Sequence, residues 1–137
     1  MQRVLRVVQW LWVLPVTLCG LPIWLGMRLF KQKHWVVHVS TAQAAILFVA
    51  IGGPAKWLLE RHPFGAMDAM VVGCCVFAQD REAYERTFAH EMVHVQQSLR
   101  WGPLFPLAYA LASVWAHCRG GCAYADNVFE RQANGLR

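Results

Sequence analysis

The five residues from His90 to His94 read His-Glu-Met-Val-His and form the clearest chemical pattern in the sequence. Residues four apart share one face of a helix, so the imidazoles of His90 and His94 can reach the same metal ion. Glu91 then lies beside the ion's open coordination position, where its carboxylate can accept a proton from bound water. The spacing therefore predicts a Zn²⁺ site that activates water. The alternative is a surface helix with two solvated histidines, or a structural metal site without turnover.

A helix has to present these residues, and local signals predict one from about Asp80 to Arg100. Asp80 is a suitable N-cap, and two acids follow in the first turns, where negative charge favours a helix. An apolar stripe suited to a protein core is formed by Tyr84, Phe88, Met92, Val95 and Leu99. The charges in the first turns make this helix too polar to cross a bilayer. Residues 65–78, a Val-rich run with an internal glycine, predict a bent strand or a small hairpin before it.

A catalytic zinc site needs a third protein ligand. The metzincin pattern would require Gly and His where Gln97 and Arg100 stand, so that pattern is rejected. Downstream, the acidic candidates are Asp126 and Glu130. Asn127 can cap a last short helix with Glu130 at its third position, which fixes the carboxylate near a helix start. We expect Glu130 to be the third ligand; the alternative is that Glu130 only completes a capping box.

The composition indicates a membrane protein. The chain is 57% hydrophobic and only 15% charged, whereas soluble domains usually carry about 25% charged residues. As a helix, the uncharged run from Val7 to Met27 matches a bilayer core of about 30 Å, with Trp10, Trp12 and Trp24 towards its ends. We expect an uncleaved membrane helix. The competing interpretation, a cleaved signal peptide, lacks a small-x-small cleavage site after the run.

Positive charge is concentrated around this helix. Residues 1–64 contain seven Lys or Arg and one acid, whereas residues 65–137 contain six Lys or Arg and seven acids. Basic residues that flank an apolar helix favour contact with membrane lipid and argue against a nucleic-acid partner. The side of the membrane on which the site lies, and the number of spans, stay open because both flanks are basic.

These patterns predict an α+β fold that is mainly helical, in three parts. Residues 1–33 form the membrane anchor helix and its basic flank. Residues 34–64 include a second apolar segment, which could span, lie in the interface or pack on the catalytic unit, since Gly-Gly-Pro interrupts it. Residues 65–137 form the catalytic unit: strand or hairpin, motif helix, and a C-terminal helix with the third ligand. Within that unit, residues 101–116 predict a buried or half-embedded helix.

Two further pairs have spacings that metals or disulfides use. Cys118 and Cys122 lack a second pair to complete a metal site, and they could form a disulfide only in an oxidising compartment. His34 and His38 repeat the spacing of the motif, but Trp35 stands where the base would be. We interpret these two histidines as interfacial residues.

The combination of His90 to His94, the following Val-Gln-Gln, and Glu130-Arg-Gln-Ala resembles the gluzincins, whose third ligand is a Glu on a later helix. The segments 101–105 and 124–130 are similar to small bacterial membrane proteins of zincin type. The likeness covers about residues 65–137. Many gluzincins have an Asp one turn after the Glu ligand, where it orients a ligand imidazole. Asn134 stands there in this chain and can still accept a hydrogen bond.

The resemblance implies a membrane-anchored zinc metallopeptidase in a cell membrane, the inner membrane in a bacterium. Zn²⁺ held by His90, His94 and Glu130 would activate a water molecule, and Glu91 would take its proton. An extended peptide substrate would pair with an edge strand within residues 70–78.

Supporting residues and alternatives complete the prediction. Asp126 and Asn134 are the candidates for orienting the ligands, and Tyr124 and His117 are the candidates for donating to the oxyanion. The alternative functions are a non-catalytic, zinc-stabilised membrane scaffold and a sensor subunit. A scaffold has no need of Glu91, and the presence of this residue argues against it.

Overall fold

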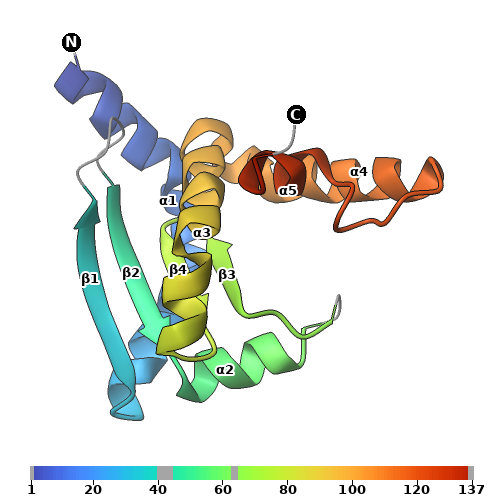
Figure 1. Ribbon diagram of the computed structural model, residues 1–137. Helices are drawn as coiled ribbons and strands as arrows, with labels where there is room; N and C mark the ends of the chain where they lie inside the picture. Colours follow the sequence, from blue (N-terminus) through green and yellow to red (C-terminus); the bar gives the residue numbers. More distant parts are fainter. Residues whose placement is uncertain (1, 40–44, 63–64, 136–137) are drawn as a thin grey trace.

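The computed structural model describes residues 2–39, 45–62 and 65–135, and it has a mixed α+β fold around one small sheet (Figure 1). The elements are α1 (Gln2–Leu29), β1 (Lys33–Val39), β2 (Ala45–Ile51), α2 (Gly53–Glu60), β3 (Ala69–Val72), β4 (Cys75–Ala78), α3 (Arg81–Trp101), the 3₁₀ turn η1 (Gly102–Leu104), α4 (Phe105–Cys118) and α5 (Val128–Ala133). The predicted fold class is confirmed at the level of a mixed α+β chain with an N-terminal apolar helix.

The four strands lie in the order β1-β2-β4-β3. β1 pairs antiparallel with β2, β2 pairs parallel with β4, and β4 pairs antiparallel with β3, which leaves β3 at one edge. The β3–β4 hairpin confirms the strand or hairpin expected within residues 65–78. Its turn needs glycine, because Gly73 has φ +63° and a Cβ there would collide with Thr17 of α1.

The second apolar segment forms part of this sheet. Lys33–Val39 and Ala45–Ile51 are strands, and β2 pairs with β4 of the motif-bearing unit. Of the three arrangements open from the sequence, the structure has the segment packed on that unit; residues 40–44 lie outside the described part. His34 and His38 are thus on a strand, where positions four apart are separated by about 13 Å and cannot share an ion. The side chain of His38 is also outside the described part.

α3 covers one face of the sheet. Its Met92, Val95 and Leu99 are buried in one hydrophobic cluster with β2 and β4, and Tyr84 and Phe88 pack against that cluster. The expected stripe is therefore confirmed. Asp80 caps α3, as predicted, by accepting a hydrogen bond from the amide of Ala83 over 2.8 Å.

α1 is the one helix in the described ranges that is long and apolar enough to cross a membrane, over Val7–Met27. It also packs on the rest of the fold. Thr17 accepts a hydrogen bond from the backbone amide of Cys74 (3.1 Å), and the indole of Trp24 donates to the carbonyl of Val49 (3.0 Å). Near its start, Trp12 abuts Gly102, whose φ of +55° ends α3. α1 is thus part of the core as well as a candidate membrane helix.

α4 and α5 lie side by side next to α3, and α5 packs against α3 (Figure 1). The buried side chain of Asn127 caps α5 by accepting from the amide of Phe129 (2.9 Å). Its amide nitrogen donates to Ser113 Oγ (2.8 Å) and to the carbonyl of Tyr109 (3.1 Å), both on α4. One side chain therefore fixes the start of α5 against α4. All the cysteines of the described residues are free, so Cys118 and Cys122 form no disulfide in the structure.

Candidate metal centre

Three predicted ligands from α3 and α5 meet in one place. Nε2 of His90 and Nε2 of His94 are 3.0 Å apart. Nε2 of His90 lies 3.2 Å from Oε2 of Glu130, and Nε2 of His94 lies 3.2 Å from Oε1 of the same carboxylate. Two atoms bonded to one zinc ion at about 2.05 Å and a tetrahedral angle are about 3.3 Å apart. The observed separations are close to this value, although the two imidazoles face different oxygens of Glu130. One donor atom from each of the three residues lies within 4.8 Å of the other two, so the group could hold one metal ion.

The opposite ring nitrogens fix the tautomers of both histidines. Nδ1 of His90 donates to Oδ1 of Asn134 (3.1 Å), and Nδ1 of His94 donates to Oε1 of Gln97 (2.8 Å). In the neutral form of each ring the proton is therefore on Nδ1, and Nε2 then has the lone pair that a metal ion needs. The predicted role of Asn134 agrees with this contact.

Gln97 is a supporting residue that the sequence reasoning missed. Its side-chain nitrogen donates to the carbonyl of Phe129 (3.1 Å) and to Oε1 of Gln132 (3.1 Å), which orients its oxygen towards His94. Gln97 is buried and links the ligand on α3 directly to α5. The available signal was its position one turn after His94, on the same face of the helix.

Glu130 lies at the base of the cluster with 2% of its surface exposed. The Tyr109 hydroxyl donates to its Oε1 over 2.6 Å, and its Oε2 lies 3.2 Å from Nε2 of His90. Burial opposes ionisation, but hydrogen bonds from His90, His94 and Tyr109 outweigh it and hold the pKa of Glu130 well below its usual range. The backbone amide of Asn127 donates to a carbonyl instead, so the alternative capping box is not formed.

Glu130 in turn changes the acidity of the histidines. For His90, the hydrogen bond to Glu130 is the largest influence and raises the pKa despite partial burial. For His94, burial acts to lower the pKa, but the hydrogen bond and charge of Glu130 outweigh it and the net shift is upward. Cationic character at the two rings is therefore favoured, as expected for a pocket whose anionic carboxylate attracts positive charge.

Glu91 is the candidate base, and it is buried next to the ligands. It is 5% exposed, and its Oε2 has no hydrogen-bond partner in the part of the chain that the structure describes. Burial raises its pKa, the two histidines lower it less, and Glu130 adds to the increase. A buried carboxylate with an unpaired oxygen and a raised pKa is suited to taking a proton from water.

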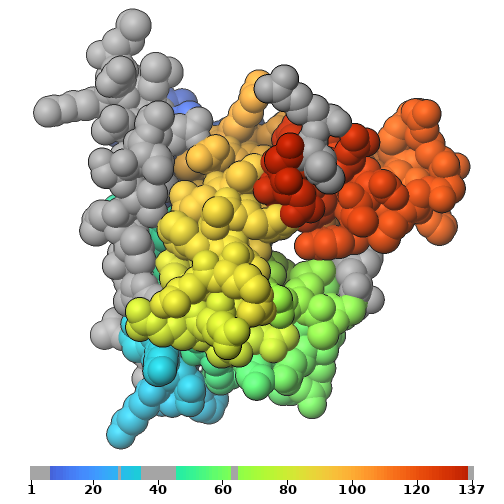
Figure 2. Space-filling model, viewed as in Figure 1, coloured from blue at the N-terminus to red at the C-terminus, as the bar shows by residue number. Residues whose placement is uncertain are grey.

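A cleft of about 640 Å³ opens beside this cluster, between the edge strand β3 and α4. His90, Glu91, His94 and Glu130 form one side, and most of the other lining residues are apolar. In the space-filling view, the hollow lies where the surfaces of α3, α5 and the chain around β3 meet (Figure 2). Both candidate oxyanion donors, Tyr124 and His117, line this cleft. Burial, together with Glu130, raises the pKa of Tyr124, which keeps its hydroxyl protonated.

Tyr109 also lines the cleft, and the sequence reasoning did not select it. Its ring stacks on Phe129 and meets His94 edge to face, with ring centroids 6.4 Å apart. Burial raises its pKa, and Glu130 raises it further, so the hydroxyl stays a donor. Tyr109 thereby fixes one oxygen of the carboxylate ligand.

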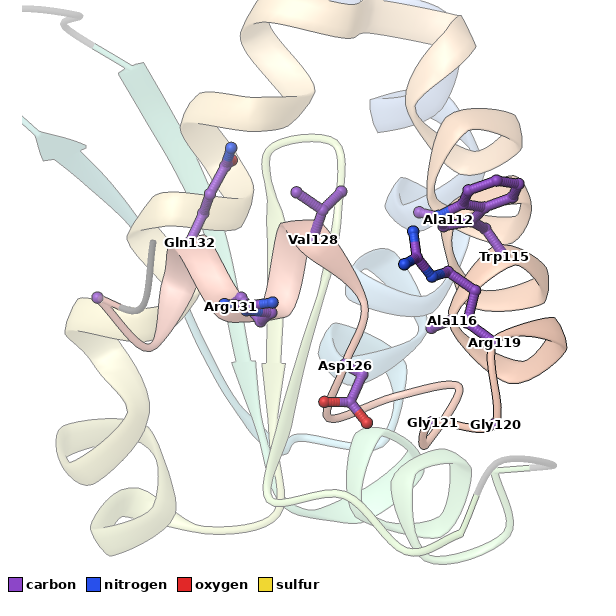
Figure 3. Close-up of a pocket in the computed structure, with 11 residues that line it drawn as sticks. Ala112, Trp115, Ala116, Arg119, Gly120, Gly121, Asp126, Val128, Arg131 and Gln132 are labelled. Carbon is purple, nitrogen blue, oxygen red and sulfur yellow. The ribbon is translucent and has the colours of Figure 1, made fainter.

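Asp126 has a different position from the one predicted. Its Oδ2 accepts a hydrogen bond from the backbone amide of Cys122 (2.7 Å) and so holds the turn after α4. Figure 3 shows its carboxylate directed to this turn, in a second hollow lined by Arg119, Arg131 and other residues of α4 and α5. That hollow contains none of the metal-ligand candidates. Asp126 therefore stabilises a loop and does not orient a ligand.

The donor set fits a zinc ion. Two imidazoles, which are neutral once an ion takes the place of their Nε2 protons, and one carboxylate form a set found in catalytic zinc sites that keep one position open. Comparison with models of known protein families, with curated proteins and with solved structures found no match to this chain. The site itself is therefore the basis for any functional conclusion.

Proposed function

We propose that this protein is a zinc-dependent peptidase of gluzincin type that acts at a cell membrane. The observation that supports the proposal best is the buried Glu91, whose Oε2 has no hydrogen-bond partner among the described residues and which lies beside a group of three residues that could hold one metal ion. A site that bound metal only to stabilise the fold would have no need of a buried, unpaired carboxylate, which costs free energy.

Each residue has a distinct task in this proposal. His90, His94 and Glu130 would hold the zinc ion, which when bound supplies Lewis acidity for water and for a substrate carbonyl. Glu91 accepts the proton of the attacking water and then delivers it to the leaving amine. Tyr124, whose hydroxyl is kept protonated, is placed in the same cleft to donate to the developing oxyanion.

The cleft also suits an extended peptide. β3 is an edge strand with one unpaired side, and Ala69, Met70, Val71 and Val72 all line the cleft. A substrate strand can therefore pair with β3 through backbone hydrogen bonds while its side chains enter an apolar space. The apolar lining favours substrates with apolar side chains near the cleaved bond.

The substitution Glu91→Gln tests this proposal against a zinc-stabilised scaffold or sensor. It keeps the shape of the side chain and removes the base, so we expect near-stoichiometric zinc, a normal fold, and peptide hydrolysis reduced by about 10² or more. Glu82→Gln, the same change at an exposed position of α3, is the matched control and should retain wild-type hydrolysis. Wild-type protein that binds zinc but cleaves no member of a broad peptide library would refute the peptidase and leave the scaffold.

A further inference from the structure

The outer face of α1 is a continuous apolar stripe. Residues three or four apart form it: Val7, Leu11, Leu14, Leu18, Pro22, Leu25 and Leu29. All of them are exposed in the structure. With a rise of 1.5 Å per residue, the stripe is about 33 Å long.

The inner face of α1 is apolar too, but it is buried. Val13, Trp24 and Met27 pack in the two hydrophobic clusters that include the sheet, α2 and α3. A surface helix of a soluble domain usually has a polar outer face. An exposed apolar stripe of this length indicates a surface that a partner covers.

The packing of α1 decides how a membrane can meet this stripe. Contacts with the rest of the fold run along the helix, from Trp12 against η1, through Thr17 at the β3–β4 turn, to Trp24 on β2. If α1 crossed a bilayer in this packing, the bilayer core would enclose the sheet and the open edge of β3. Open sheet edges facing lipid leave backbone groups unsatisfied at a cost of several kcal/mol each. An orientation parallel to the membrane surface avoids this cost.

Charge favours lipid over a protein partner. Basic residues lie at both ends of the stripe: Arg3 and Arg6 before it, and Arg28, Lys31 and Lys33 at or after its end. No acid occurs between the start of the chain and the end of β2. Cations beside an in-plane apolar helix match the headgroups of anionic lipids.

We propose that α1 lies in the plane of an anionic lipid surface, with its outer stripe among the acyl chains and the sheet on the water side. This proposal for the outer face of α1 does not depend on the proposed peptidase activity. In this arrangement α1 contacts one leaflet of the membrane, whereas hydropathy alone led us to expect a helix that crosses it.

Vesicle binding tests the surface. The full-length chain, diluted from mild detergent, is floated with vesicles of equal parts phosphatidylcholine and phosphatidylglycerol. We expect Leu11→Glu combined with Leu18→Glu to lower binding at least about tenfold, with unchanged zinc content and circular dichroism. The matched control is Leu107→Glu with Leu111→Glu on α4, because these leucines are as exposed (59% and 61%) as those on α1 (64% and 53%). Equal losses in both pairs, or a lipid-independent dimer that only the α1 pair disrupts, would overturn the proposal.

Depth measurements separate an in-plane helix from a spanning one. The exposed native cysteines are replaced by serine, and a single cysteine at Leu11, Leu18 or Leu25 carries a fluorophore. Quenchers attached to lipids at known depths then measure how deep each fluorophore lies in the bilayer. An in-plane helix places all three probes at the same shallow depth. A spanning helix places the probe at 18 deepest, near the bilayer centre, and that result would refute the in-plane arrangement.

Discussion

Gln97 offers a sharp test of how the fold supports the metal ligands. Gln97→Leu keeps the size of the side chain but removes the acceptor that holds Nδ1 of His94 at 2.8 Å. Loss of such a partner typically weakens metal binding by about 10–100-fold, or about 1.4–2.7 kcal/mol. The same substitution leaves the buried carbonyl of Phe129 without its donor, which should lower the free energy of unfolding of the metal-free protein by about 1–3 kcal/mol.

Two measurements separate these effects: zinc affinity by competition with a chelator, and urea unfolding of the metal-free protein. Gln97→Glu is the informative companion, because it retains the acceptor for His94 and loses the donor to Phe129. We expect it to be destabilised like Gln97→Leu but to bind zinc within about threefold of wild type. Zinc affinity within about twofold of wild type in Gln97→Leu would refute the idea that Gln97 orients the ligand.

Two further predictions concern the ligands. Glu130→Ala should lose zinc at least about 10²-fold more readily than wild type, whereas Asp126→Ala should bind it normally, since Asp126 only holds a turn; equal zinc affinities measured for the two variants would contradict the assignment. Zinc affinity should also decrease as the pH is lowered. The pKa values of His90 and His94 are raised above 6.5, so each ring is neutral only above its own raised pKa and must otherwise release a proton to bind zinc. Below both pKa values, chelator competition should show affinity falling by up to about 100-fold per pH unit, and a flat profile between about pH 8 and 5 would exclude these histidines as ligands.

Local patterns were enough to predict the motif helix and its ends. Asp80 caps α3 and Asn127 caps α5 because capping depends on residues a few positions apart. The meeting of Glu130 with the histidines was inferred from the need for a third ligand, and the structure brings these residues together.

The second apolar segment shows where such reasoning fails. β2 has neighbours on both sides and is covered on both faces, with Leu47 and Val49 in one cluster and Ala50 in the other. A strand buried on both faces has no alternation of polar and apolar residues, so its sequence resembles a membrane segment. Gln97 and Tyr109 were missed for another reason. Tyr109 contacts Glu130 twenty-one residues away, and although Gln97 stands one turn after His94, the contact that holds it in place is with Phe129, thirty-two residues away; no local spacing records such distant contacts.

The contact of Trp12 with Gly102 also bears on the order in which the molecule can assemble. α1 precedes η1 in the chain, so this partner is synthesised only after the sheet and α3 are complete. Until the strands that cover it have been synthesised, the inner face of α1 is as uncovered as its outer face, and contacts between distant parts of a chain form slowly. A nascent chain that carries so apolar a helix would gain from early contact with lipid, before the ligands on α3 and α5 have been made. Attachment to the membrane would then precede assembly of the metal centre.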